Sequence, residues 1–381
     1  MKILKLIKII FTSKKTFKSL NRKKIFFYSN ESYNLFQDYF KEREIFVLER
    51  NLKKIYLQVV IKLFTKFFII NHREYIYEII RQVNPRFIIS IIDNDSLLWE
   101  IKKKFPNIKV IIIQNGYRYN NNYDKYFENL DKNINRKIDL FFVFNKNISV
   151  IYEKFFQSEI IVSGSIANNK SIIKDLKKKT KSVLFISEWG PFKKVFHKNV
   201  NGYKKFHESC VFFVRFLSDY CFKNNYEFYI MGRPLDIKNS KKEIEFYNNC
   251  IGNKKWIYKR TKNSRKSSYD EIDNHEIIAS ITSTLGYESL ARKNKTIIFD
   301  GRNSYSFGWP KKMQEEGPFW TSNYDINKLT NIMDYLKKSD KKTWEKCLEE
   351  YLNDLLIYDE NNSIIFGRLK KFKELNEELI K

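Results

Sequence analysis

Short runs of β-branched and aromatic residues, separated by longer stretches of helical character, recur along most of this chain. In its first half these runs are IFFY at Ile25, IFVL at Ile45, FIISII at Phe87, KVIIIQ at Lys109, LFFVF at Leu140 and IIVSG at Ile160. Runs that are apolar throughout are typical of parallel strands buried on both faces. The pattern therefore predicts an α/β domain whose parallel sheet is covered by helices on both sides.

A second series of such runs follows a stretch of different composition. Residues 170–181 (KSIIKDLKKKTK) hold six lysines, one aspartate and no aromatic residue, which is typical of an exposed connection between domains. The later runs are VLFIS at Val183, EFYIMG at Glu227, KWIYK at Lys255, EIIASI at Glu276 and TIIFD at Thr296. They predict a second α/β domain of the same kind.

The predicted fold class is α/β, with two tandem Rossmann-like domains and a cleft between them. We place the first domain at 1–169, the linker at 170–182 and the second domain at 183–345. Residues 346–381 are predicted to form a helical tail that packs back on the first domain. In open α/β sheets ligands bind beyond the carboxyl ends of the strands, so side chains that directly follow strands are candidate site residues.

The chain is strongly basic, with 71 Lys and Arg against 44 Asp and Glu and a formal charge of +27. This excess favours a nucleic acid, an anionic membrane face or an anionic small substrate as partner. Codon bias in an A+T-rich genome explains it equally well, since Lys, Asn, Ile, Phe and Tyr are abundant together. No RNP-like, helix-turn-helix or zinc-finger pattern accompanies the lysines, so no nucleic-acid partner is expected.

Residues 1–30 contain nine basic residues and no acidic one, with aliphatic residues among them. A basic amphipathic segment of this kind can lie on anionic lipid. Alternatively, it packs as an opening strand or helix whose lysines extend to solvent. No uncharged apolar run approaches the ~20 residues that span a bilayer, and no signal-peptide pattern is present. We expect a cytoplasmic protein, and peripheral contact with the inner membrane face is a further hypothesis.

The cysteines and histidines indicate neither a metal nor a redox site. Cys210, Cys221, Cys250 and Cys347 form no CxxC pair and have no histidine at ligand spacing, so buried free thiols are expected. Neither the dinucleotide-binding motif GxGxxG nor the P-loop motif GxxxxGK[ST] occurs, so neither supports a redox or ATPase function. The expected site therefore contains no metal and no cofactor.

The stretch TSTLGYESLARKNKTIIF (282–299) follows a predicted strand and begins a helix that ends near Arg292. The free N–H groups and the positive dipole end of such a helix start favour a phosphate. Ser283 and Thr284 can supplement these donors, and Gly286 lets a ligand approach the backbone closely. The sequence therefore predicts a phosphate site here.

Glu288, in the same helix, admits two interpretations. A capping box would place a glutamate three residues after the cap, and neither Ser283 nor Thr284 has one there. Glu288 can instead bind the ribose hydroxyls of a nucleotide. Alternatively, it forms an exposed i,i+4 ion pair with Arg292, worth only ~0.2–0.5 kcal/mol.

Polar side chains also follow two strands of the first domain. Asp93 and Asn94 come after FIISII, and Gln114, Asn115 and Gly116 come after the next run. Both groups should fall on one sheet edge. A carboxylate there can accept a proton from an attacking hydroxyl, or act as the nucleophile itself.

Asp93 and Arg233 each have a purely structural alternative. Asp93 or Asn94 can cap the following helix, although Asp95 or Ser96 could cap it just as well. Arg233 lies in MGRP, directly after a predicted strand, and can hold a phosphate through its fork of donors. Alternatively, it is an ordinary surface arginine in a turn.

Five short segments, taken in order, resemble bacterial surface-carbohydrate or O-antigen biosynthesis proteins. They are DN at Asp93, KFPN, QNGYR at Gln114, GRP at Gly232 and STLGYESLARKNKTIIF at Ser283. These proteins are similar to glycosyltransferases of the GT-B type. The resemblance covers about Phe87 to Phe299. It implies a nucleotide-sugar donor held chiefly by the C-terminal Rossmann-like domain and an acceptor held by the N-terminal one. It also implies a reaction that commonly needs no bound metal.

We therefore expect a glycosyltransferase that moves a sugar from a nucleotide-sugar to an O-antigen-like or capsule-like surface polysaccharide, with a glycan or lipid-linked glycan as acceptor. The predicted roles are donor binding for Arg233, Ser283, Thr284, Gly286 and Glu288, catalysis for Asp93, and substrate orientation for Asn94, Gln114, Asn115 and Gly116. Alternatives on the same fold are a polyol-phosphate transferase and a nucleotide-sugar epimerase. An alternative of another class is a non-enzymatic basic protein that binds membrane or nucleic acid.

Overall fold

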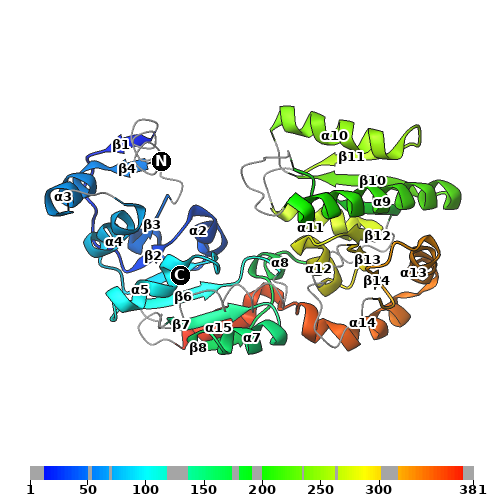
Figure 1. Ribbon diagram of the computed structural model, residues 1–381. Helices are drawn as coiled ribbons and strands as arrows, with labels where there is room; N and C mark the ends of the chain where they lie inside the picture. Colours follow the sequence, from blue (N-terminus) through cyan, green and yellow to red (C-terminus); the bar gives the residue numbers. More distant parts are fainter. Residues whose placement is uncertain are drawn as a thin grey trace.

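The computed structural model describes residues 13–49, 54–67, 71–117, 136–173, 180–190, 200–233, 236–261, 265–301 and 316–371. Within them the chain forms two α/β domains, each built on a six-stranded parallel sheet (Figure 1). The predicted fold class is confirmed. Within these ranges every helix is too short or too polar to cross a bilayer.

The first sheet has the strand order β3-β2-β5-β6-β7-β8. Its strands are β2 Ile25–Phe27, β3 Ile45–Val47, β5 Phe87–Ser90, β6 Lys109–Ile113, β7 Lys137–Val143 and β8 Gln157–Val162. The helices of this domain include α2 Asn30–Phe36, α4 His72–Val83, α5 Ser96–Lys104, α7 Lys146–Glu153 and α8 Ile166–Asn169, with a 3-10 turn at Glu42–Glu44. Each predicted run of the first half forms one of these strands, so those predictions are confirmed.

Both faces of this sheet are buried because successive side chains of a strand point to opposite sides. In β2, Ile25 and Phe27 belong to one apolar cluster and Phe26 belongs to another. All three side chains are fully buried. The continuous apolar run is therefore the direct cause of the two-sided packing.

A separate two-stranded parallel sheet pairs β1 (Lys14–Thr16) with β4 (Lys54–Tyr56). The helix α3 (Leu57–Phe67) follows β4 directly. For the basic N-terminal segment the sequence left membrane contact, a strand and a helix open. Its described part contains two strands, β1 and β2, while residues 1–12 lie outside the described residues.

The second sheet has the order β11-β10-β9-β12-β13-β14. Its strands are β9 Thr180–Ile186, β10 Glu227–Gly232, β11 Ile257–Arg260, β12 His275–Ser280, β13 Lys295–Phe299 and β14 Trp320–Thr321. The helices of this domain include α9 Val200–Asn224, α10 Ile237–Ile251, α11 Arg265–Asn274, α12 Thr284–Ala291, α13 Ile326–Lys338 and α14 Lys341–Leu355. All five predicted strands of this half are found, and β14 was not predicted.

The domain limits differ in detail from those predicted. The strand β9 begins at Thr180, inside the predicted linker 170–182, and α14 runs across the predicted end of the second domain at residue 345. After α14 the chain returns to the first domain through a 3-10 turn at Glu360–Asn362 and the helix α15, Ser363–Lys370. There the ring of Phe366 stacks on Tyr39, with 3.4 Å between ring centroids. The last described helix thus joins the first domain (Figure 1).

Candidate functional site

Three neighbouring strands of the second sheet end at one edge, and polar side chains follow each of them. Ser187 and Glu188 follow β9, Arg233 follows β10, and Ser283 lies between β12 and α12. Because β10, β9 and β12 are adjacent and parallel, these segments meet at the carboxyl edge of the sheet. This is the edge at which the sequence placed the donor site.

The start of α12 differs from other helix starts of this domain. Its N-cap residue is Ser283, whose side chain makes no capping hydrogen bond. By contrast, the side chains of the N-cap aspartates of α10, α13 and α14 each accept a hydrogen bond from a backbone N–H of their own helix. Ser283 and Thr284 are both partly exposed. A helix start that its own side chain leaves uncapped is suited to bind an anion.

Gly286 lies in the first turn of α12 and is buried against β12. A Cβ at this position would lie 2.5 Å from both Cβ and Oγ of Ser280, which is itself fully buried. The structure therefore gives Gly286 a packing role, because only a glycine lets the helix lie this close to the strand. Its predicted contact with a ligand stays a prediction.

Gly286→Ala is expected to lower the free energy of unfolding by about 1–3 kcal/mol, because the added methyl group overlaps Ser280 in a packed contact. Gly367→Ala is the matched control, since Gly367 lies exposed in α15 and a Cβ there would meet nothing within 4 Å. The control should raise that free energy by about 0.4–1 kcal/mol, because alanine favours a helix. Chemical denaturation of both variants measures the difference, and equal effects would contradict the packing role.

Glu188 was not selected from the sequence, yet its carboxylate lies at the same sheet edge. It accepts hydrogen bonds from the backbone N of Thr282 at 2.8 Å and from Thr282 Oγ1 at 3.0 Å. Glu188 is partly exposed. It comes directly after the predicted strand VLFIS, so the rule that selected Asp93 would have found it too.

A buried carboxylate beneath this edge holds three strand ends together. Glu243 of α10 is fully buried, and it accepts hydrogen bonds from Ser187 Oγ at 2.5 Å and from Tyr258 Oη at 2.6 Å. Burial raises the pKa of Glu243, while the hydrogen bonds from Ser187, Tyr258 and the backbone of Arg233 oppose that shift. The Glu243 carboxylate thereby fixes the backbone of Arg233 and so positions its side chain at the edge of the sheet.

Arg233 itself is exposed, as its predicted role requires. Its guanidinium lies beside the loop after β9, since a Cβ at Gly190 would be 3.6 Å from Nη1 of Arg233. Phosphate binding by Arg233 stays a prediction.

The first domain touches the start of α12 through the segment that follows β6. The backbone N of Tyr117 donates a hydrogen bond to Thr284 Oγ1 at 3.0 Å. The ring of Tyr117 stacks on Tyr287, with 3.6 Å between centroids and 7° between the planes. The carboxyl edges of the two sheets therefore meet at α12.

Gln114, Asn115 and Gly116 form the turn that leads to Tyr117. Gln114 is buried, and its amide bonds backbone groups at both ends, accepting from the N of Phe144 at 2.9 Å and donating to the O of Gly116 at 2.8 Å. Gln114 therefore shapes the turn, and any effect on a substrate is indirect. Asn115 is exposed and Gly116 partly exposed, so both are placed where a substrate could contact them.

Glu288 and Arg292 do not form the exposed ion pair that was one of the two interpretations of Glu288. Both are buried, and Arg292 pairs with Asp273. Glu288 Oε1 instead accepts a hydrogen bond from Ser165 Oγ, at 2.5 Å, in the segment after β8 of the first domain. The ion-pair interpretation is wrong, because this face of α12 packs inside the protein. Ribose binding by Glu288 stays a prediction.

Asp93 and Asn94 follow β5, the strand next to β6. The helix α5 is capped by Asp95, whose Oδ1 accepts from the N of Leu97, so neither Asp93 nor Asn94 is the cap. Asn94 is exposed, but Asp93 is only 1% exposed and its Oδ2 accepts from Tyr152 Oη at 3.1 Å. Asp93 thus lies at the predicted edge but beneath its surface.

Among the described residues, no group of three or more His, Cys, Asp or Glu side chains is placed to hold a metal ion.

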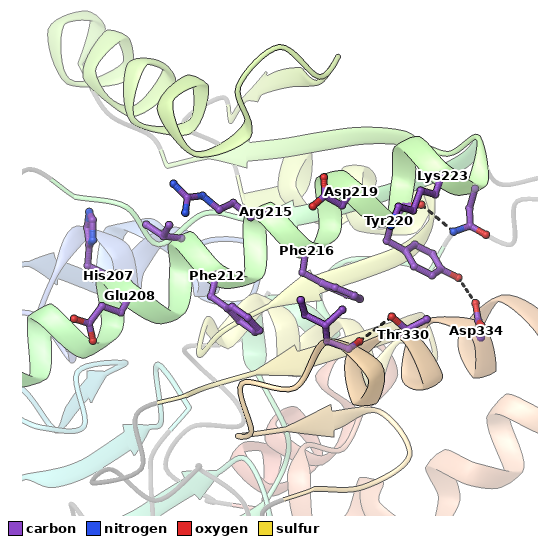
Figure 2. Close-up of a pocket in the computed structure, with 13 residues that line it drawn as sticks. His207, Glu208, Phe212, Arg215, Phe216, Asp219, Tyr220, Lys223, Thr330 and Asp334 are labelled. Atoms are coloured by element: carbon purple, nitrogen blue, oxygen red, sulfur yellow. Dashed lines mark hydrogen bonds between the residues drawn. The ribbon is translucent and has the colours of Figure 1, made fainter.

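A groove of about 760 Å³ lies between α9 and α13, with Phe212 and Phe216 in its wall (Figure 2). The described residues that line it include none of the predicted site residues, so this groove is not the predicted site.

Two parallel-sheet domains that meet at their carboxyl edges, with a C-terminal helix returned to the first domain, define a protein of the GT-B-like class. The model of a family described as "putative O-antigen biosynthesis protein" matches residues 111–373, and the chain belongs to this family. This confirms the resemblance drawn from the motifs. A search of curated proteins finds no match.

Solved structures with the same fold include a protein solved with UDP, an epimerase and a synthase. S. aureus MnaA, solved with UDP, is 13% identical, with 93% of this chain and 97% of that chain covered and a TM-score of 0.52. A UDP-N-acetylglucosamine 2-epimerase is 10% identical, with 95% and 98% covered and a TM-score of 0.52. Sucrose-phosphate synthase from Thermosynechococcus elongatus is 12% identical, with 89% and 86% covered and a TM-score of 0.50. At these identities they show the fold.

Proposed function

We propose that this protein is a glycosyltransferase that moves a sugar from a nucleotide-sugar donor to a surface polysaccharide acceptor of the O-antigen or capsule kind. Membership of the O-antigen biosynthesis family supports the acceptor class. The observation that carries the proposal is the start of α12, where Ser283 makes no side-chain cap and Tyr117 of the first domain contacts Thr284. One helix end suited to an anion is thereby shared by both domains.

On the donor side, Ser283, Thr284 and the first amides of α12 bind the diphosphate, and Arg233 neutralises it. Gly286 keeps α12 against the sheet, and Glu288 binds the ribose after releasing Ser165. In the transfer, the bond from the anomeric carbon to the phosphate breaks and a bond to an acceptor oxygen forms. The helix dipole and Arg233 stabilise the departing phosphate, so the proposed reaction needs no metal.

On the acceptor side, Asp93 takes the proton of the attacking hydroxyl, or acts as the nucleophile if the configuration is retained. Asn94, Asn115 and Gly116 orient the sugars, and Gln114 holds the turn that presents the last two. We propose that the reaction takes place in the cytoplasm, at the inner face of the membrane.

A thermal-shift panel of UDP-, GDP-, CMP- and dTDP-linked sugars tests donor binding. A donor at 100 times its Kd should stabilise the folded protein by about 2.7 kcal/mol. Arg233→Ala should weaken its binding about 10- to 100-fold, since a hydrogen bond to a charged group contributes about 1.5–3 kcal/mol. Arg73→Ala, which removes an exposed arginine of the first domain, should leave binding unchanged. Lack of binding by every donor, together with steep salt-dependent binding to nucleic acid, would overturn the proposal.

Product analysis by mass spectrometry separates the reactions that this fold can support. Sugar transfer to an acceptor is expected. Transfer of glycerol phosphate or ribitol phosphate would identify a polyol-phosphate transferase, and isomerisation without an acceptor would identify an epimerase. Either result would replace the glycosyltransferase proposal while leaving the donor site in place.

A further inference from the structure

The small β1–β4 sheet and α3 form a surface at the end of the first domain remote from the second domain (Figure 1). Gln58 of α3 donates from Nε2 to the O of Phe17, at 2.9 Å, which ties the end of β1 to this helix. The surface lies outside the proposed transfer site, so binding of a partner there does not depend on the transfer reaction.

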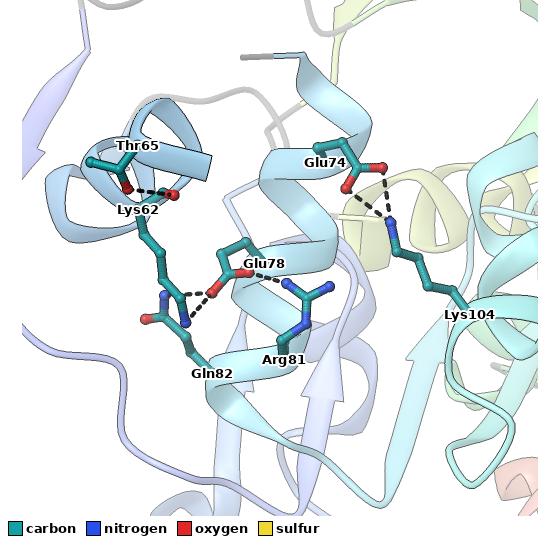
Figure 3. Close-up of polar contacts among 7 residues, drawn as sticks. All are labelled: Lys62, Thr65, Glu74, Glu78, Arg81, Gln82 and Lys104. Atoms are coloured by element: carbon teal, nitrogen blue, oxygen red, sulfur yellow. Dashed lines mark hydrogen bonds and ion pairs between the residues drawn. The ribbon is translucent and has the colours of Figure 1, made fainter. Parts of the chain in front are cut away.

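The orientation of α3 is fixed from its inner side. Val59 and Leu63 are buried in the core of the first domain. Lys62 Nζ lies 2.8 Å from Oε1 of Glu78, a buried carboxylate of α4 that also binds Arg81 (Figure 3). Burial opposes the charge of Glu78, but the hydrogen bonds from Lys62 and Gln82 and the charge of Arg81 outweigh it and lower the pKa of Glu78. The helix is thus anchored with one defined face outward.

That outward face carries two large apolar side chains beside polar ones. Ile61 is 55% exposed and Phe64 56% exposed, and their i,i+3 spacing places them side by side on the helix. Phe17, held next to α3 by Gln58, is 69% exposed. Large apolar side chains gathered on one exposed face mark an interaction surface.

The two segments that form this surface carry charge of one sign, although Glu78 lies beneath α3 and Glu49 lies near Tyr56 of β4. Residues 13–30 and 54–67, which form β1, β4, α3 and their flanks, contain nine basic residues and no acidic one. Lys14, Lys15 and Lys18 are exposed. Lys62 already pairs with Glu78. A second copy of the same basic surface would be repelled, whereas an anionic bilayer complements it.

We propose that the α3 patch, consisting of Phe17, Ile61 and Phe64 with Lys14, Lys15 and Lys18, docks on an anionic lipid bilayer. The lysines contact lipid phosphates, and the three apolar side chains enter the boundary between headgroups and acyl chains. This attachment would hold the enzyme at the membrane surface without a spanning helix.

Co-sedimentation of the full-length protein with lipid vesicles tests the proposal. The protein should bind vesicles of phosphatidylcholine and phosphatidylglycerol in equal parts, bind vesicles of phosphatidylcholine alone much less, and be released as salt rises. Ile61→Ser with Phe64→Ser should weaken binding on the order of tenfold. Lys14→Glu with Lys18→Glu should weaken it by a similar factor.

Matched variants in the second domain test whether a loss of vesicle binding is specific to the α3 patch. Phe222→Ser with Ile237→Ser removes two apolar side chains of the second domain that are more exposed than Ile61 and Phe64. Lys241→Glu with Lys242→Glu reverses the charge of two exposed lysines of α10. Neither should change vesicle binding. Every variant should keep the unfolding midpoint and the nucleotide-sugar binding of the unchanged protein, which separates docking from the donor site.

Four results would overturn the proposal. These are no binding to the anionic vesicles, equal binding to both lipids, equal losses in the patch and control variants, or an α3 patch that serves another partner. The last would appear as dimerisation in size-exclusion chromatography that is lost with Ile61→Ser and Phe64→Ser, or as RNA binding that is lost with the lysine variant.

Discussion

Arg292→Met is expected to lower the free energy of unfolding by about 3–5 kcal/mol, because it leaves a buried carboxylate without its counter-charge. The guanidinium is fully buried and donates to both oxygens of Asp273, from Nε at 2.9 Å and from Nη2. Asp273 is also buried. Methionine fills much of the same space, so the loss is chiefly electrostatic.

The same side chain also supports the connection between the domains. Nη1 donates to the O of Ser171 at 2.8 Å, and Nη2 donates to the O of Ile172 at 3.1 Å. In the variant the O of Ile172 loses this donor, whereas the O of Ser171 keeps a hydrogen bond from Tyr358 Oη at 3.2 Å, so the added cost comes chiefly from Ile172. Because Arg292 follows α12 directly, the variant should also loosen the helix that carries the proposed phosphate site.

Urea denaturation followed by tryptophan fluorescence measures this effect. Arg73→Met is the matched control, because Arg73 pairs with Glu100 at the surface, with 46% of its side chain exposed. An exposed pair contributes about 0–1 kcal/mol, so this control should change little. If both variants lost the same small amount, the Arg292 pair would not be the stabilising contact that its burial indicates.

The sequence located the main strands because each is an apolar run long enough to be recognised by itself. In β6, for example, Val110 to Ile113 are buried, and no polar residue interrupts them. The shorter pairings could not be found this way. The strand β1 is Lys14–Thr16 and β14 is Trp320–Thr321, and neither carries an apolar pattern of its own. They exist because a distant partner strand supplies their hydrogen bonds.

For the candidate site, the sequence predicted which residues follow strands but not what those residues contact. Asp93 meets Tyr152 and Glu288 meets Ser165, across separations of 59 and 123 residues that no local pattern encodes. The i,i+4 rule failed for Arg292 because it applies to exposed helix faces, and this face is buried. Tertiary packing decided the partner in each case.

Asp93→Asn is expected to lower turnover on the order of 10²-fold or more, as loss of a positioned general base does. The substitution keeps the size of the side chain but removes the proton acceptor. Binding of the nucleotide-sugar should be unchanged, because Asp93 lies in the first domain and the proposed donor residues lie in the second. Steady-state kinetics and a donor titration separate the two effects.

Tyr152→Phe distinguishes a catalytic Asp93 from a structural one. The variant removes the hydroxyl that donates to Asp93 and keeps the ring that packs on Phe141 and Phe156. Loss of this buried hydrogen bond should lower the free energy of unfolding by about 1–3 kcal/mol. If Asp93 serves only this bond, turnover will fall no further in Asp93→Asn, whose amide oxygen can still accept from Tyr152 Oη, than in Tyr152→Phe, which loses the bond. If Asp93 is the base, Tyr152→Phe will keep most of the turnover that Asp93→Asn loses. In that case substrate binding must expose the Asp93 carboxylate, which is only 1% exposed in the free protein. Near-normal turnover of Asp93→Asn would end the assignment.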